Sequence, residues 1–306
     1  MARLHILSSS AIDTLRYTQV LDAAKAPAYA YPWYLDALNL QWSVLVVDDY
    51  AAVMPLLEQK KALWRYTSMP LLVQKWGLFS AHTLSDSEIT TIAAYLKKSF
   101  ALIDYRVDDT VNSIALAKHF TQQSRINYIL HLNTPIDTIR NTYNTQTKRN
   151  LKTARESALD VRFDIPATYV VDLYKTHIAS KDEKVSAAFY TTLPTHLQRF
   201  IENGKGQTAG VYKQNMLHAA AFYVHTGHSI INIFPASHPA GRDTQAMTLL
   251  VDTMLERYAG SPQVFDFEGS MIESIARFYK GFGAELQTYT GITYNRLPRW
   301  VRWIRR

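Results

Sequence analysis

The sequence contains no cysteine, which excludes disulfide bonds, a cysteine nucleophile and any metal or iron–sulfur site built on thiolates. Long apolar runs are also lacking. The longest, such as residues 44–47, have the length of a strand, whereas a membrane-spanning helix needs about 20 residues. The N-terminal apolar stretch is too short for a secretory signal, since Asp13 and Arg16 follow soon after. These absences predict a cytoplasmic protein without a transmembrane segment.

Glycine is sparse, with 11 residues in 306, and none of the glycine-based nucleotide or nucleophile motifs is present. The ten histidines are scattered, and none forms the paired arrangement with glutamate that marks a zinc-binding helix. Four of them lie close in sequence: His218, His225, His228 and His238. The sequence therefore predicts no metal and no tightly bound cofactor.

Acidic residues are absent after Glu285, whereas five arginines follow it, and the net charge of the chain is +7. Such a balance favours an anionic partner: a phosphorylated donor, a nucleic acid or a membrane surface. The segment 297–306 mixes arginine with tryptophan, so as a helix it would be suited to weak contact with anionic lipid. The alternative is a terminal helix that docks on the protein itself.

The order of patterns along the chain predicts an α+β fold with two lobes, residues 1–122 and 123–306. In the first lobe, two apolar runs at 42–47 and 51–57 flank an acidic turn and predict a hairpin. A helix is expected at 85–100, where Ser85 precedes Glu88 by three residues in a capping-box pattern. The polar stretch 108–125 would separate the lobes.

The second lobe is expected to begin with a strand at 127–132 and a helix of about twenty residues at 136–158. Three strands are predicted for its middle, near 208–212, 219–225 and 229–234. Helices and strands then alternate, with a helix at 243–258 opened by Asp243, a strand at 264–268, a helix at 270–280 and a strand at 288–294.

Several segments in this order resemble the Fem-type branch of the N-acyltransferase (GNAT) superfamily. They are residues 31–35 (YPWYL), 53–56 (VMPL), 148–152 (KRNLK), 265–270 (FDFEGS) and 278–283 (FYKGFG). The resemblance covers nearly the whole chain and implies two fused GNAT-like lobes, each a mixed, mainly antiparallel sheet flanked by helices. It also implies transfer of an acyl or aminoacyl unit to an amine, with acyl-CoA or aminoacyl-tRNA as co-substrate.

The sequence departs from that superfamily where a glycine-rich coenzyme A loop would precede a helix. Residues 237–243 read SHPAGRD and contain a single glycine, Gly241. A tight cradle for a pyrophosphate is therefore not expected. Arg242 remains a candidate to hold a donor phosphate, although the segment also fits a plain helix cap.

The candidate catalytic residues lie near the C-terminal end of the second lobe. Asp266 and Glu268 alternate with two phenylalanines, so on a strand both carboxylates would share a face, and one can act as general base. Ser270 and Glu273 form a capping-box pattern at the next helix. Tyr279 can return a proton to a leaving group and Lys280 can stabilise an oxyanion, as the resemblance implies; Lys280 alternatively stabilises a helix C-terminus.

Lys148, Lys152 and Arg155 lie at helical spacing on one face, with Arg149 beside them. Such a stripe can neutralise phosphates of a nucleotide-linked acceptor or of tRNA, and it also fits a solvated helix face. We therefore expect an N-acyltransferase that acts on a small-molecule or peptide amine, including a cell-wall precursor. The alternative is a non-catalytic binding or scaffold protein that keeps this fold.

Overall fold

The computed structural model describes residues 3–178, 187–269 and 271–298. The chain divides into two compact units, Met1–Arg125 with Thr288–Arg306, and Ile126–Gln287. The expected division at residue 122 differs from this one mainly at the C-terminal end. There the last strand, β13 (Glu285–Asn295), pairs through residues 290–295 with β6 (Leu102–Val107) of the first unit.

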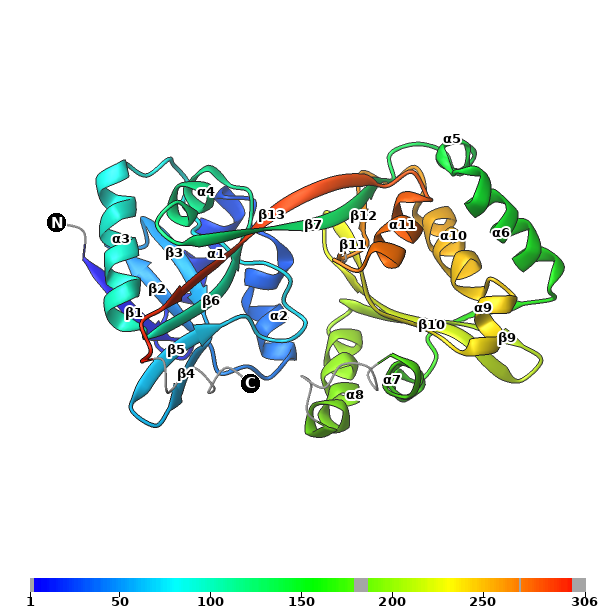
Figure 1. The fold of residues 1–306 in the computed structure, drawn as a ribbon, viewed down its shortest axis with the longest axis horizontal. Coiled ribbons are helices and arrows are strands. Elements are labelled where there is room, and N and C mark those ends of the chain that lie inside the picture. Colours follow the sequence, from blue (N-terminus) through cyan, green and yellow to red (C-terminus); the bar gives the residue numbers. More distant parts are fainter. Residues whose placement is uncertain (1–2, 179–186, 270, 299–306) are drawn as a thin grey trace. The chain divides into compact units, whose positions relative to one another are not determined.

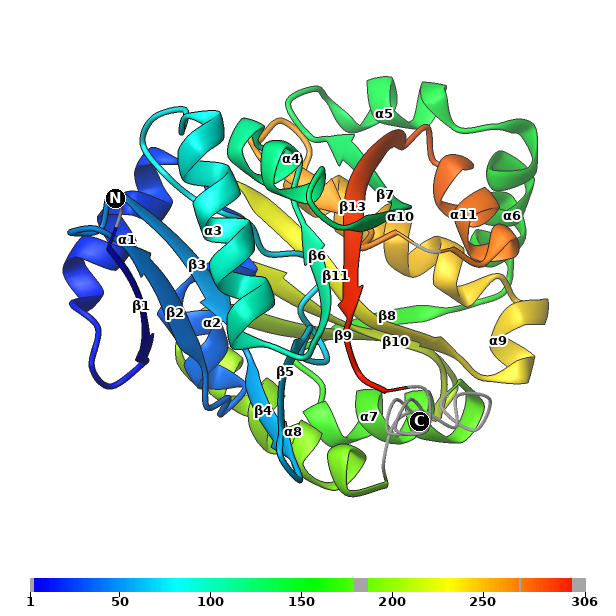
Figure 2. The same cartoon turned by 60° about the vertical axis from the view of Figure 1, so that its left-hand side comes forward.

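In the first unit, helices pack against the strands of two sheets (Figures 1 and 2). Its remaining elements, in chain order, are β1 (Leu4–Ser8), α1 (Thr14–Ala23), η1 (Ala28–Ala30), α2 (Pro32–Ala37), β2 (Ser43–Val47), β3 (Ala52–Leu56), β4 (Glu58–Lys61), β5 (Trp64–Ser68), α3 (Asp86–Ser99) and α4 (Val111–Ala117). β1, β2 and β3 form an antiparallel sheet. β4, β5, β6 and β13 are consecutive strands of a second, mixed sheet, in which β5 and β6 are parallel and β7 (Thr121–His131) is the other neighbour of β13. The predicted hairpin and the capping box of α3 are confirmed.

The second unit is entered through β7 (Thr121–His131). Its further elements are α5 (Ile136–Thr142), α6 (Thr145–Glu156), β8 (Asp160–Phe163), α7 (Ala167–His177), α8 (Ala187–Glu202), β9 (Gly206–Lys213), β10 (Met216–His225), β11 (Ser229–Ser237), α9 (Pro239–Asp243), α10 (Ala246–Tyr258), β12 (Val264–Asp266) and α11 (Glu273–Lys280). The sheet order is β7-β12-β11-β10-β9-β8, with β11 and β12 as the parallel pair. The predicted α+β class with mixed, mainly antiparallel sheets is confirmed.

Helices cover both faces of this sheet (Figure 1). Strand alternation assigns the side chains of β10: Ala219, Ala221 and Tyr223 lie in the core beneath α10, whereas Phe222 contacts Phe200 of α8 on the other face. The helix predicted near 243–258 is confirmed as α10, in which Leu250, Val251, Met254 and Leu255 form a buried apolar stripe.

Three local predictions were wrong. The expected helix at 136–158 is two helices, because Tyr143 is extended and Asn144 caps α6 by accepting from the amide of Thr147. Asp243 does not open α10, which starts after Gln245 in the left-handed conformation. α11 starts at Glu273 with Ile272 as its N-cap, so Glu273 cannot be the third residue of a capping box; Ser270 lies outside the described residues.

α9 packs against β10 at a contact that only glycine permits. A Cβ on Gly241 would lie 1.9 Å from the carbonyl oxygen of His218, which is backbone and cannot move aside cheaply. We predict that Gly241→Ala lowers the free energy of unfolding by about 3 kcal/mol, the upper end of overpacking costs. Gly227→Ala is the control, because a Cβ there meets nothing within 4 Å. Urea unfolding of both variants tests this, and equal stabilities would contradict it.

Candidate active site

A cavity of about 430 Å³ lies in the second unit where β11 continues beyond the end of β12. These two strands pair over only three residues, 229–231 with 264–266, and β11 then runs on to Ser237. The wall includes Asn232 of β11, Thr248 of α10 and Tyr279 of α11 from one side of the sheet, and Ile178, which follows α7. The opening between the two parallel strands is therefore lined by side chains from several elements.

The equivalent place in the first unit is filled. β5 and β6 also pair in parallel over three residues, after which the chain returns at Trp76 to pair with Val107 of β6. Trp76 is fully buried, and its indole N–H donates to the carbonyl of Tyr29 at 2.6 Å. The two units thus share a strand–helix–strand arrangement, and in the first one a segment of the chain occupies the gap.

Two of the predicted site residues line the cavity in the second unit, Tyr279 and Arg242. Tyr279 is 6% exposed, and its ring packs on Phe267 at a centroid distance of 4.8 Å. Burial raises the pKa of its phenol, and the negative charges of Glu268 and Asp266 raise it further. The hydroxyl therefore keeps its proton and is available as a hydrogen-bond donor.

Neither candidate carboxylate lines the cavity, but both lie close enough to Tyr279 to raise its pKa, and their local settings differ. Asp266 ends β12, and its Oδ1 accepts from the side chain of Asn127 at 3.0 Å and from the amide of Glu268 at 2.8 Å. Glu268 has left the strand, with φ of 57°, and the following Gly269 also has positive φ. Asp266 thus holds a tight turn that places Glu268 just beyond the strand end.

Gly269 is required by this turn, because a Cβ there would lie 2.2 Å from the carbonyl oxygen of Ile126. Around the cavity, Phe234 and Gln245 are further non-glycine residues in the left-handed region. Non-glycine residues held in that region often occur at functional sites, where the surrounding structure compensates a cost of order 1–2 kcal/mol. The same conformation occurs at turns elsewhere in the chain, Asp48 and Gln214 among them, so here it describes the local turns around the cavity.

Lys280 is not brought into the cavity. It is the last residue of α11, its side chain is exposed, and the cavity wall does not include it. Arg242 lies on the wall and is exposed; it belongs to α9, whose backbone occupies the place expected for a donor-binding loop. The amides of Gly241, Thr244 and Gln245 donate to backbone carbonyls of this same segment, so they are not directed at a ligand.

The predicted basic stripe lies on α6, at a separate cavity of about 390 Å³. Lys148 and Lys152 line it, and both are exposed; the Nζ of Lys148 donates to the carbonyl of Asn141 at 3.1 Å. Arg149 is exposed and does not line this cavity. The structure therefore brings Lys148, Lys152 and Arg155 of the predicted stripe together with one further arginine, Arg140.

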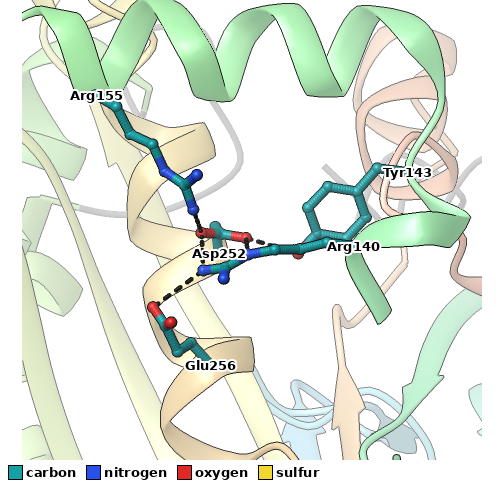
Figure 3. Close-up of polar contacts among 5 residues, drawn as sticks. All are labelled: Arg140, Tyr143, Arg155, Asp252 and Glu256. Atoms are coloured by element: carbon teal, nitrogen blue, oxygen red, sulfur yellow. Dashed lines mark hydrogen bonds and ion pairs between the residues drawn. The ribbon is translucent and has the colours of Figure 1, made fainter. Parts of the chain in front are cut away.

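Asp252, which the sequence reading missed, anchors that basic cavity (Figure 3). Its carboxylate is 1% exposed and accepts from Arg140 at 3.0 and 2.8 Å, from Arg155 at 3.2 Å and from the hydroxyl of Tyr143 at 3.0 Å. Asp252 could have been noticed in the sequence because it is an acidic residue within the apolar stripe of α10, four residues after the buried Thr248. The interaction ties α5 and α6 to α10.

We predict that Asp252→Ala lowers the free energy of unfolding by about 3 kcal/mol, because the partly buried guanidinium of Arg140 and the buried hydroxyl of Tyr143 lose their shared acceptor. Glu256→Ala is the matched control. Glu256 contacts the same Arg140 at 3.0 Å, but its side chain is 53% exposed, so the cost is expected to stay below about 1 kcal/mol. Chemical denaturation measures the difference, and equal losses in the two variants would argue against the anchoring role.

Three histidines meet beside α9. The ring of His238 lies 5.0 Å from that of His177 and 6.5 Å from that of His218, whose Nδ1 is 3.0 Å from the hydroxyl oxygen of Thr244. Desolvation lowers the pKa of both His177 and His218, and the proximity of His238 lowers it further. Within the described parts of the chain, no group of three or more histidine, cysteine or acidic side chains could hold a metal ion.

We predict that acid destabilises the second unit through this cluster. Because the folded pKa of His177 and His218 is depressed, the unfolded chain binds more protons between that value and the ordinary histidine value of about 6.5. Stability is therefore lost as pH falls through this window. Melting curves from pH 7.5 to 5 should show a shallower decline for His218→Gln than for the exposed control His228→Gln, and identical slopes would refute the effect.

The chain as a whole is similar in fold to solved acyltransferase-type structures. One is FemX, at 12% identity over 99% of this chain and 100% of that chain, with a TM-score of 0.64. A second is a tandem GNAT protein from the clavulanic acid biosynthesis pathway, at 12% identity over 97% and 99%, with a TM-score of 0.57. A third is L-PGS from Bacillus licheniformis, at 12% identity over 95% of both chains, with a TM-score of 0.54.

These matches confirm the predicted resemblance and the tandem GNAT-like fold. No family model matches the sequence, and no curated protein matches it. At identities this low, structural similarity establishes the fold but not the reaction. Among the described residues, no helix has both the length and the apolar character that crossing a membrane requires.

Proposed function

We propose that this protein is an N-acyltransferase, which moves an acyl or aminoacyl group from an activated donor to an amine. The observation that carries the proposal is the cavity at the parting of β11 and β12, where a protonated phenol, Tyr279, lies within electrostatic reach of two carboxylates. The fold similarity to FemX and to a tandem GNAT protein supports the same class of reaction.

In the proposed reaction, Glu268 takes a proton from the acceptor amine, whose nitrogen then attacks the acyl carbonyl carbon. We assign the base to Glu268 because it lies just beyond the strand end, whereas Asp266 is the residue whose Oδ1 holds the turn. The carbon–nitrogen bond forms, the ester or thioester bond to the carrier breaks, and the hydroxyl of Tyr279 donates to the departing oxygen or sulfur. The proton held by Glu268 then passes to the phenolate of Tyr279, so both side chains return to their starting state, and the products are an amide and the free carrier.

The acyl carrier is proposed to be anionic, with phosphates near Arg242 at the cavity wall. Lys148, Arg149 and Lys152 are proposed to contact phosphates of the carrier or of a nucleotide-linked acceptor, such as a cell-wall precursor. The backbone of α9 favours aminoacyl-tRNA over acyl-CoA, because the amides of Gly241, Thr244 and Gln245 are used within the segment and are not directed at a pyrophosphate.

The donor can be identified by thermal shift with acetyl-CoA and aminoacyl-tRNA, and the acceptor by thermal shift with a uridine-diphosphate-linked muramyl pentapeptide. We predict that, with the stabilising pair as substrates, Glu268→Gln and Tyr279→Phe each lower the transfer rate by roughly 10²–10⁴-fold, because each removes one proton-transfer group. Lys280→Met should stay close to wild type, since this exposed side chain does not line the cavity.

Transfer is followed by mass spectrometry of the amide product, and circular dichroism confirms that each variant is folded. Full activity in both Glu268→Gln and Tyr279→Phe would overturn the assigned roles. Loss of activity in Lys280→Met alone would restore the oxyanion role first considered for that residue. Binding without transfer by the wild-type protein would support the alternative, a non-catalytic binding protein with this fold.

A further inference from the structure

Asn232 is a buried amide in the cavity wall that the proposed reaction does not use. It lies in the middle of β11 and is 1% exposed. Neither its Oδ1 nor its Nδ2 has a hydrogen-bond partner among the described residues. A buried amide of this kind costs about 1–3 kcal/mol when it is left unpaired, so its retention needs a reason.

Tyr223 lies directly beside Asn232, because the two residues are register partners of β10 and β11 and therefore share a face of the sheet. Its side chain is fully buried, and its hydroxyl also has no partner within the described residues. The phenols of Tyr223 and Tyr279 interact electrostatically, which places this hydroxyl on the same side of the sheet as the proposed reacting groups.

Three unpaired polar atoms thus gather behind one wall of a cavity that is otherwise mostly apolar, with side chains such as Ile178, Met247, Ile275 and Phe278. An acetyl or longer alkyl group would leave all three unpaired. A short acyl group with a hydroxyl or amino substituent next to its carbonyl would supply both a donor and an acceptor, and Asn232 offers the complementary pair.

We propose that Asn232, with Tyr223 behind it, selects acyl groups that carry a hydroxyl or amino substituent over plain alkyl acyl groups. The inference rests on the proposed function, since it names the class of acyl unit for the same cavity. A site built to hydrogen-bond a substituent discriminates against the analogue that lacks it, because its own polar atoms are then left unpaired.

The test uses three small amides of nearly equal size as probes: propionamide, lactamide and alaninamide. Titrations followed by NMR should give the wild-type protein roughly 10-fold tighter binding of lactamide or alaninamide than of propionamide, the value of one well-formed hydrogen bond. Comparison of lactamide with alaninamide shows whether the site prefers a hydroxyl or an amino substituent. Asn232→Leu should abolish the preference, and Tyr223→Phe should reduce it.

Stability provides a second readout that a purely structural asparagine would not satisfy. Asn232→Leu should leave the melting temperature unchanged or raise it by about 2–4 °C, because an unpaired amide is replaced by an apolar group of similar size. The matched control is Asn112→Leu, which should lower the melting temperature. Asn112 is also buried, but its amide accepts from the backbone of Leu84 at 2.9 Å and donates to that of His82 at 3.0 Å.

Equal binding of the three amides by the wild-type protein would overturn the proposal, as would a loss of stability in Asn232→Leu as large as in Asn112→Leu. Acyl transfer is measured separately. Equal rates for propionyl and lactyl or alanyl donors would reject the selectivity and keep the acyltransferase. Discrimination among the amides without any transfer would reject the acyltransferase and keep the polar recognition.

Discussion

The short parallel pairing of β11 with β12 is the constraint on which the candidate site depends. Three residue pairs hold these strands together, and beyond them β11 continues while β12 turns away. The groups with a proposed role in proton transfer and acyl recognition lie around this point. Glu268 follows the end of β12, Tyr279 is on the next helix, and Asn232 is on the part of β11 beyond its pairing with β12. Because both backbones are fixed by the sheet, the site is built on rigid elements at its base.

In the first unit, the space beside the short parallel pair β5–β6 is occupied by another segment of the chain. Trp76 and the residues up to Phe79 pair with β6 on one side and β3 on the other, so the interior is continuous there. The second unit keeps this opening, and there the side-chain amide of Asn232 has no hydrogen-bond partner among the described residues. Two related supersecondary arrangements in one chain therefore differ at the place where chemistry is proposed.

Much of the fold could be predicted from local patterns, because strand alternation and helical spacing depend only on residues that are close together in the sequence. Phe265 and Phe267 are buried while Asp266 and Glu268 are half-buried, as the alternation indicated. The helix break at Tyr143 and the left-handed residues Gln245 and Glu268 could not be predicted, since distant contacts impose them. Tyr143 leaves the helix and bonds to Asp252, more than a hundred positions away.

The candidate site was predictable only in part for the same reason. Tyr279 and Arg242 were chosen from their motifs and line the cavity, whereas Lys280, the neighbour of Tyr279, points to solvent. A helix turns by about 100° per residue, so adjacent residues cannot share a face, and the motif alone did not indicate which one is inside. Asn232 and Tyr223 carry no motif. Their pairing appears only once the register of β10 and β11 is known.

The division of the chain also has a consequence for the order in which the protein is made. The first unit is built from two separate segments, and β6 receives its partner β13 only from the last part of the sequence. The second unit is one uninterrupted segment. During synthesis from the N-terminus the second unit can therefore complete its sheet first, while the earlier-made unit waits with an open strand edge, which is the state most exposed to wrong pairing.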